Sequence, residues 1–327
     1  MRRTALDSSQ EAVFLCLSAL RLIKKQKGDY LETKYPTLGR MLHKGKQKAV
    51  WEIIGDPRHV AIEIFDDITA GDGEIHTTIQ GKRVPLTKMI CNLFILFERK
   101  GLFTHFLEQL TESTFLAYKG KPYPLEVIAR GFWAGSYRSR KSNMPGGAPA
   151  EGTLLEEIVL EANWKNDNFM WHGERIADPL LKYNEETGWY DLYHPKKPDL
   201  YLAELPRDVF MPTWEEMKEI FAQHKEAYII LRDELSKHNL DLWDMKGEYG
   251  RIRTLDGIAK IVMLDGIDID CCRIREKGHP EISLDKDDFR KLHKNELGAE
   301  EEQFFLNKYL IFAKISESFV QEETVCA

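Results

Sequence analysis

Three charged residues at alternate positions form the strongest chemical signal in this sequence. Asp244, Lys246 and Glu248 would project from the same face of an extended strand. The apolar, β-rich run over 261–264 predicts the partner strand and delivers Asp265 at its end. Carboxylate oxygens beside an ammonium group are suited to binding a magnesium–nucleotide complex. Spacing alone fits a solvated hairpin with ordinary cross-strand ion pairs equally well, so both interpretations stay open.

Two further segments carry side chains that could bind phosphate groups. The turn over 45–48 places Lys46 and Lys48 before a strand, but it lacks the leading glycine and the following Ser or Thr of a P-loop. Arg130 ends an apolar strand, and Ser136 follows a glycine. An arginine fork beside a hydroxyl group is a suitable phosphate clamp. An exposed basic turn and a surface arginine would explain the same residues without any ligand.

The remaining polar segments are weak signals individually. The glycine-bearing loop over 66–73 contains Asp72, but an Asp-Gly pair is common in turns. The other segments are 165–167, which begins with Lys165, the pair at 178–179, and 270–273, which ends at Arg273.

The composition is that of a globular protein. Hydrophobic residues make up 43% and charged residues 30% of the 327 positions, which excludes disordered and fibrous classes. The formal net charge of −7 disfavours a nucleic-acid partner, whose binding depends on a cationic surface. Five cysteines show neither zinc-ligand spacing nor a disulfide framework, which predicts reduced thiols in the cytoplasm.

The N-terminal segment favours neither a signal peptide nor a membrane anchor. Its apolar run over 12–23 is too short to span a bilayer, and lysines follow it in place of a cleavage site. We expect a helix over 8–27 that packs on the body of the protein. No membrane partner is expected, and a homo-oligomer is compatible with the sequence.

Periodicity along the chain predicts the elements that position these residues. We expect helices over 86–100, 213–238 and 301–320, and a glycine- and proline-rich loop over 141–152. We expect an antiparallel β unit over 40–84, a strand pair at 114–119 and 125–130, and β structure over 242–270. Strands followed by mixed segments predict an α+β fold with two lobes and a cleft between them.

In their order and separation, these segments resemble the SAICAR synthetase family of purine biosynthesis. The resemblance extends over residues 42–290. It includes one matching segment not mentioned above, 285–290, which contains Lys286. The matching segments are 45–48, 67–73, 124–136, 165–179, 244–250, 264–273 and 285–290.

Several departures indicate a divergent branch of that family. Gly266 stands where the family has Glu, Ile269 replaces a proline, and the pair at 271–272 replaces two small residues with cysteine. The segments 1–39, 168–177 and 188–212 are extra by the same comparison.

The resemblance implies a fold and a division of the chain. The fold would be α+β, with an antiparallel β-sheet in an N-terminal lobe, a mixed α+β C-terminal lobe and an ATP cleft between them, related to kinase and ATP-grasp architecture. The division would be an N-terminal extension over 1–39, a nucleotide-binding lobe over 40–122 and a substrate lobe over 123–327.

The resemblance also implies a reaction. Members join the carboxylate of an aminoimidazole ribonucleotide (CAIR) to the amine of L-aspartate, and they use ATP to form an acyl phosphate, with Mg²⁺ as the metal cofactor. The partners would therefore be small molecules: ATP, CAIR and L-aspartate. No protein nucleophile is required, in keeping with the absence of a Ser-His-Asp or Cys-His pattern in the sequence.

Residue roles follow from the same resemblance. Nucleotide phosphates and their metal would be bound by Lys46, Lys48, Lys165 and Asp265, with Glu248 and Asp265 as the Mg²⁺ ligands. Catalysis would involve Lys246, Asp244 and Glu248. CAIR would be held by Arg130, Ser136, Arg273, Lys286 and Asp72, and the adenine would lie against residues 119–123.

Two alternatives remain open at this point. An inositol-phosphate kinase also carries a D-x-K-x-G element, which 244–247 fits in part. A nucleotide-binding relative without catalytic activity is suggested by Gly266, although the charged residues at 46, 48, 246, 248 and 265 argue against it.

Overall fold

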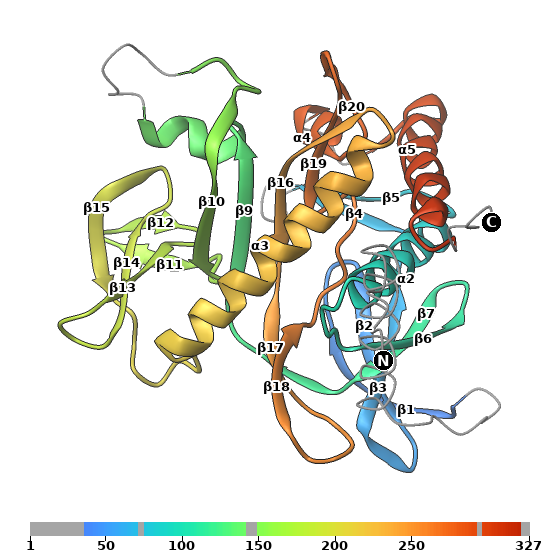
Figure 1. Ribbon diagram of the computed structural model, residues 1–327, viewed down its shortest axis with the longest axis horizontal. Helices are drawn as coiled ribbons and strands as arrows, with labels where there is room; N and C mark the ends of the chain where they lie inside the picture. The colour runs from blue at the N-terminus through green and yellow to red at the C-terminus, as the bar shows by residue number, and fades with distance from the viewer. Residues whose placement is uncertain (1–35, 71–74, 142–148, 293–295, 322–327) are drawn as a thin grey trace, which may run out of the picture.

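A computed structural model describes residues 36–70, 75–141, 149–292 and 296–321 of the chain (Figure 1). The predicted helix over 8–27, Asp72 and part of the predicted loop over 141–152 lie outside these ranges. The described part is mixed α+β with antiparallel strand pairing, in agreement with the predicted fold class.

The first sheet has five strands in the order β1-β2-β3-β7-β6. Strands β2 and β3 form the predicted hairpin, with Lys48 opposite Ile64 and Ile53 opposite Asp56. The strands are β1 (Leu38–Lys44), β2 (Lys48–Ile53), β3 (Asp56–Ile64), β6 (Phe106–Thr111) and β7 (Thr114–Tyr118). The turn over 45–48, which carries the two candidate lysines, therefore joins β1 to β2.

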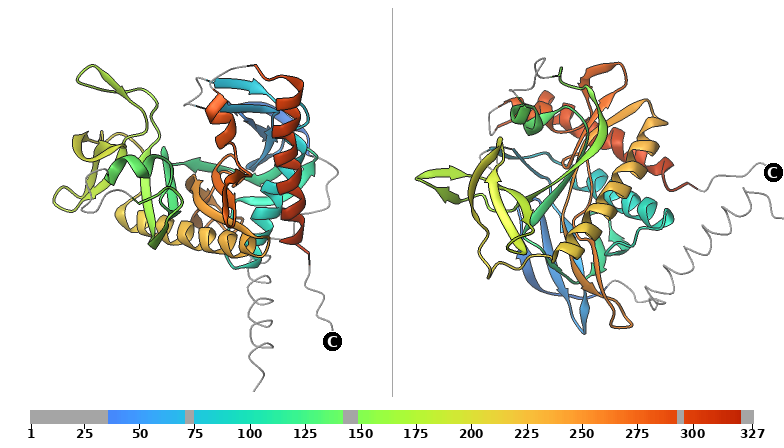
Figure 2. Two further views of the ribbon diagram at one scale, coloured as in Figure 1. Left: turned by 90° about the horizontal axis from the view of Figure 1, so that it is seen from above. Right: turned by 60° about the vertical axis from the view of Figure 1, so that its left-hand side comes forward.

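Helix α2 (Arg83–Arg99) matches the predicted helix, and its apolar residues at helical spacing are buried. The late helix α5 (Ala299–Ser318) lies beside it in two views (Figures 1 and 2). A buried hydrogen bond from Asn92 Nδ2 to Ser316 Oγ, 3.0 Å long, joins the two helices. A segment near the C-terminal end thus covers an element of the first third of the chain.

The second sheet has eight strands in the order β15-β14-β13-β10-β9-β16-β19-β20. Helix α3 (Trp214–Ser236) crosses it in front of β9 and β16 (Figure 1). Thr213 and Glu216 form a capping box at the start of α3, where the sequence predicts that a helix begins. The strands are β9 (Leu125–Phe132), β10 (Leu154–Trp164), β13 (Leu180–Asn184), β14 (Trp189–His194), β15 (Lys197–Glu204), β16 (Leu240–Gly247), β19 (Cys272–Glu276) and β20 (His279–Ser283).

Short elements complete the fold. The hairpin β17–β18 pairs with β8, and further two-stranded pairs are formed by β4 with β5 and by β11 with β12. The elements are β4 (Asp67–Ala70), β5 (Ile75–Thr78), β8 (Gly120–Pro122), β11 (Phe169–Trp171), β12 (Glu174–Ile176), β17 (Tyr249–Arg253), β18 (Ala259–Met263), the 3-10 helix η2 (Gly135–Lys141) and α4 (Asp287–Leu292).

Two predicted strand pairings are corrected by the structure. The strands at 114–119 and 125–130 exist as β7 and β9, but β7 pairs with β3 and β6 whereas β9 pairs with β10 and β16. The run from Asp244 to Gly250 is not one strand, because it breaks at Glu248 into β16 and β17. The run over 261–264 pairs with β17 only, while β16 lies between β9 and β19.

Side chains from both sheets share one apolar cluster, which includes residues of α2, α3 and α5. Within the described ranges, Cys91, Cys271 and Cys272 are free cysteines. In the same ranges, no helix has both the length and the apolar character needed to cross a bilayer.

Candidate active site

The pairing of β9 with β16 determines which charged side chains share a face. Asp244 lies opposite Arg130, and Lys246 lies opposite Ile128. Directly opposite residues of antiparallel strands point to the same side, as do alternate residues of one strand. Glu126 therefore faces Lys246, whose ammonium donates to Glu126 Oε1 over 2.7 Å. The alternate spacing predicted from the sequence holds for Asp244 and Lys246.

Arg130 is the centre of a buried network of charge-assisted hydrogen bonds, since only 2% of its surface is exposed. Its Nε donates to Glu161 Oε2 over 2.7 Å, and its two terminal nitrogens donate to Asp244 and to Ser136 Oγ, each over 3.2 Å. A second arginine, Arg273, donates to the same oxygen of Asp244 over 2.5 Å. The structure therefore brings together the predicted residues Arg130, Ser136, Arg273 and Asp244.

Gly135 permits this close arrangement. Its φ of +57° lies in the left-handed region that favours glycine, at the start of η2. A Cβ atom at this position would lie 2.6 Å from a terminal nitrogen of Arg273. Glycine before Ser136 thus leaves room for the Arg273 guanidinium to approach the hydroxyl-bearing turn.

A second charged cluster forms around Glu248 and Asp265. Lys48 is ion-paired with Asp265, and Lys165 Nζ donates to Glu248 Oε1 over 2.6 Å. The backbone hydrogen bond from Leu264 N to Glu248 O, 2.9 Å long, places Asp265 directly after the residue that faces Glu248. The structure therefore brings Lys48, Lys165, Glu248 and Asp265 to one place, although they are distant in sequence.

The pKa values of the two carboxylates shift in opposite directions. Burial and the neighbouring charge of Asp265 raise the pKa of Glu248 above its ordinary value. Burial acts in the same direction on Asp265, but the nearby ammonium groups of Lys48, Lys165 and Lys246 outweigh it and lower its pKa. Glu248 is thus a carboxylate whose negative charge lacks full compensation from the protein.

These residues fit a magnesium ion that is bound together with phosphates. Mg²⁺ is held in nucleotide sites by one or two carboxylates, with phosphate oxygens and water as the other ligands. Glu248 and Asp265 supply such a pair. Within the described part of the chain, no group of three or more His, Cys, Asp or Glu side chains could hold a metal by itself, so the remaining ligands would come from the nucleotide and water.

The other predicted residues lie around these two clusters. Lys46 is half exposed, and its ammonium is 3.7 Å from Asp167 Oδ2. Lys286 lies near Asp270 and Arg290; burial lowers the pKa of Lys286 despite the opposing effect of Asp270. No carboxylate of the described residues lies within ion-pair distance of its ammonium. Asp72 lies outside the described residues.

Sequence reasoning missed the acidic partners of these cations. Glu126 and Glu161 hold Lys246 and Arg130, and Asp287 Oδ2 accepts from Arg273 Nε over 3.2 Å. Glu126 could have been found, because it lies four residues before Arg130 and so on the same face of the strand. Glu161 is identified only by the pairing of β10 with β9.

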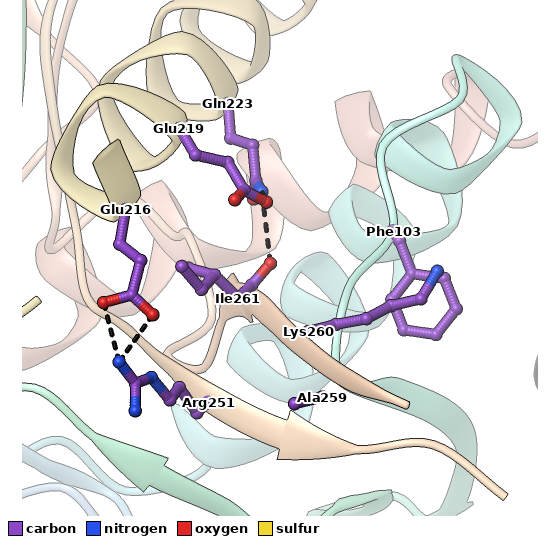
Figure 3. A pocket seen from close by; sticks show the side chains of 8 residues that line it. All are labelled: Phe103, Glu216, Glu219, Gln223, Arg251, Ala259, Lys260 and Ile261. Carbon is purple, nitrogen blue, oxygen red and sulfur yellow. Dashed lines mark hydrogen bonds and ion pairs between the residues drawn. The ribbon is translucent and has the colours of Figure 1, made fainter. Parts of the chain in front are cut away.

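A cavity of about 650 Å³ lies elsewhere, between the start of α3 and the β17–β18 hairpin (Figure 3). None of the predicted site residues lines it. Its Arg251 is already paired with Glu216, and its Gln223 donates to the carbonyl of Ile261 over 3.1 Å (Figure 3). Cavity size therefore does not identify the candidate site, which is defined by its converging charges.

Comparisons with known proteins agree on one family. The SAICAR synthetase family model matches residues 41–304. The phosphoribosylaminoimidazole-succinocarboxamide synthase of Clostridium botulinum (strain Hall) is 32% identical over 251 residues, which cover 77% of this chain and 90% of that protein. The synthase of Fusobacterium nucleatum is 28% identical over 266 residues, covering 81% and 94%.

Solved structures give the same result. A SAICAR synthetase in complex with ADP superposes with a TM-score of 0.63 at 29% identity, covering 84% of this chain and 97% of that one. The enzyme of Pyrococcus horikoshii OT3 superposes with a TM-score of 0.62 at 28% identity, covering 83% and 97%. The ordered motifs, the charged site and these matches together show that the chain belongs to the SAICAR synthetase family.

Proposed function

We propose that this protein is an ATP-dependent carbon–nitrogen ligase that joins CAIR to L-aspartate and forms SAICAR, ADP and phosphate in purine biosynthesis. The proposal rests on one observation above all: two charged clusters form around Asp244, on β16, and around Glu248, which directly follows β16. One is rich in lysines around a carboxylate pair, and the other has two arginines and a hydroxyl. Family membership supplies the identity of the substrates. The cytoplasm is the proposed location.

The chemistry requires activation of a carboxylate. Its leaving group would be oxide, so phosphorylation by ATP first gives an acyl phosphate that the aspartate amine can attack. We propose that Lys46, Lys48 and Lys165 bind nucleotide phosphates and that Glu248 and Asp265 hold Mg²⁺. When bound, Mg²⁺ neutralises phosphate charge. Lys246 lies between the clusters, where its ammonium can stabilise the transferred phosphoryl group.

The arginine cluster is the proposed CAIR site. Arg130 is almost fully buried and has hydrogen-bond acceptors around it, so its main effect is to fix Ser136 and Asp244. Arg273 retains about a fifth of its side-chain surface and is the more accessible guanidinium. Lys286 adds a cation without an ion pair among the described residues. Charge-assisted hydrogen bonds from these groups are suited to a ribotide phosphate.

The direct test is product formation by the purified protein from ATP, CAIR and L-aspartate, with omission of each substrate as a control. CAIR labelled with heavy oxygen in its carboxylate should give labelled inorganic phosphate only while aspartate is consumed. Unlabelled phosphate during stoichiometric SAICAR formation would exclude direct phosphorylation of the carboxylate. Absence of SAICAR from protein that binds ADP would favour a nucleotide-binding relative without ligase activity.

A further inference from the structure

Asp270 lies at a point where four separate segments of the chain meet. Gln47 Nε2 donates to its Oδ2 over 3.0 Å, and the Lys82 ammonium is 3.3 Å from the same oxygen. The Tyr309 hydroxyl donates to Oδ1 over 2.6 Å. These partners come from the turn over 45–48, from the residue before α2 and from α5. The Asp270 carboxylate therefore connects the turn over 45–48 to the start of α2 and to α5.

Asp270 and its partners Lys82 and Tyr309 are buried, and two of the three carry a charge. Asp270 is 5% exposed, Lys82 is fully buried and Tyr309 is 2% exposed. Burial alone would raise the pKa of Asp270, but Lys82, Lys286 and Tyr309 outweigh that effect and hold it below its ordinary value. A buried carboxylate that loses one of its hydrogen-bond donors is less well stabilised, so each contact to Asp270 affects the others.

Gln47 carries this constraint to the proposed nucleotide site. It stands between Lys46 and Lys48, in a turn closed by the hydrogen bond from Gly45 N to Lys48 O, 2.8 Å long. Its carbonyl accepts from Phe65 N over 2.8 Å, and its side chain reaches Asp270. Lys48 is paired with Asp265 in the same loop that carries Asp270. The turn is thus attached to this loop at two points.

We propose that Gln47 and Tyr309 are positioning residues for ATP, which act through Asp270 on the turn that carries Lys46 and Lys48. This inference rests on the proposed use of ATP at that turn. It assigns helix α5, which is distant from the turn in sequence, a role in nucleotide affinity.

The test measures ADP affinity by calorimetry in folded variants and the Michaelis constants for all three substrates. Gln47→Ala and Tyr309→Phe should each weaken ADP binding and raise KM for ATP by roughly fivefold to tenfold, because each removes a hydrogen bond to a charged group. KM for CAIR and for aspartate should stay within twofold. In the double variant, the two effects should be less than multiplicative, because both act through one carboxylate.

Two matched variants separate positioning from a general loss of stability. Tyr190→Phe removes a buried hydroxyl that donates to Pro212 O over 3.2 Å, and Gln109→Ala removes an exposed amide that donates to Thr111 O over 2.9 Å. Both should keep wild-type ADP affinity. Unchanged ADP affinity in Gln47→Ala and Tyr309→Phe, or equal weakening in Tyr190→Phe, would overturn the inference. If ADP binding is weakened as expected in Gln47→Ala and Tyr309→Phe but the wild-type protein forms no SAICAR, only the proposed ligase function is overturned.

Discussion

Asp265 has one charged neighbour that it attracts and one that it repels. It is ion-paired with Lys48, and it raises the pKa of the neighbouring Glu248. The same carboxylate thus neutralises one cation and disfavours ionisation of a second carboxylate. A bound cation such as Mg²⁺ would reduce the repulsion between the Asp265 and Glu248 carboxylates.

Asp265→Asn should therefore abolish SAICAR synthesis while the unfolding temperature changes by only a few degrees. The amide keeps the shape of the side chain but removes one charge of the proposed metal pair. Steady-state kinetics at increasing Mg²⁺ and thermal unfolding measure the two effects. Near-normal turnover at saturating Mg²⁺ would place the metal site elsewhere.

Arg273 donates from a terminal guanidinium nitrogen to Asp244 and from Nε to Asp287. Arg273→Lys keeps the charge but loses the planar geometry, so KM for CAIR should rise about tenfold, equivalent to loss of about 1.5 kcal/mol. The exposed Arg232, which pairs with Asp233, provides a control, since Arg232→Lys should leave KM for CAIR unchanged. A changed KM for ATP with an unchanged KM for CAIR would show that Arg273 does not bind CAIR.

The sequence predicted the cations of the site better than their partners. Lys246 and Asp244 could be placed on one face from their spacing alone. Glu161 could not be assigned to Arg130, because that contact depends on which strand β10 joins. Strand pairing is decided by burial across the whole sheet, which local spacing does not encode.

At the scale of elements, the packing of α2 limits the size of the side chain at position 266, in the loop after β18. A Cβ atom at Gly266 would lie 2.5 Å from Ile90 Cγ2 of α2. The space that a side chain at position 266 would occupy is therefore filled by an apolar side chain of α2. Glycine at this position thus permits the close contact between α2 and the loop after β18.

Gly266→Ala should destabilise the protein by about 1–3 kcal/mol through overpacking. Ile90→Ala alone should cost about 2–5 kcal/mol because it leaves a cavity. The double variant should cost less than the sum, since each change relieves the fault of the other. Chemical denaturation of the three variants measures this coupling, and strict additivity would show that the two residues do not compete for space.

His224 joins helix α3 to the strand break at Glu248. It is fully buried, its Nε2 donates to Met245 O over 3.0 Å, and the Tyr249 hydroxyl donates to Nδ1 over 3.3 Å. Burial, only partly offset by the Met245 carbonyl, lowers the pKa of His224 to about 4. The imidazole is therefore neutral in the folded protein at pH values where an unfolded chain would bind a proton.

This difference gives a defined pH dependence. Between about pH 6.5 and pH 4, the unfolded state binds the proton and the folded state does not, so stability falls as the pH falls. Wild-type protein should lose about 2 kcal/mol more than His224→Gln between pH 7.5 and pH 5, as measured by urea denaturation. Parallel pH profiles of the two proteins would contradict a neutral buried His224.

Element identities followed from periodicity, while their partners did not. The helices over 86–100, 213–238 and 301–320 are confirmed as α2, α3 and α5 because each has an apolar face at helical spacing. The pairing of β7 with β9 was wrong, because the two strands are separated only by the short strand β8 but belong to different sheets. The short connection between them turns the chain from one sheet to the other.

At the scale of the whole molecule, one apolar cluster includes residues of both sheets, although the chain is predicted to have two lobes. A continuous core favours a single unfolding transition. ADP, which would bind only the folded state, should raise the stability of that whole transition by about 2.7 kcal/mol at a hundredfold excess over its Kd. Calorimetry with and without ADP tests this expectation, and two transitions of which only one shifts would indicate independent lobes.

The contact between α2 and α5 also affects synthesis of the protein on the ribosome. Asn92 and Ser316, which bond across these helices, are 224 positions apart. At translation rates of about 5–20 residues per second, α2 must wait roughly 11–45 s for its partner to emerge. During that interval the apolar side chains that α5 later covers stay accessible to chaperones and to other nascent chains. Synthesis of α5 is therefore the event that ends this period of exposure.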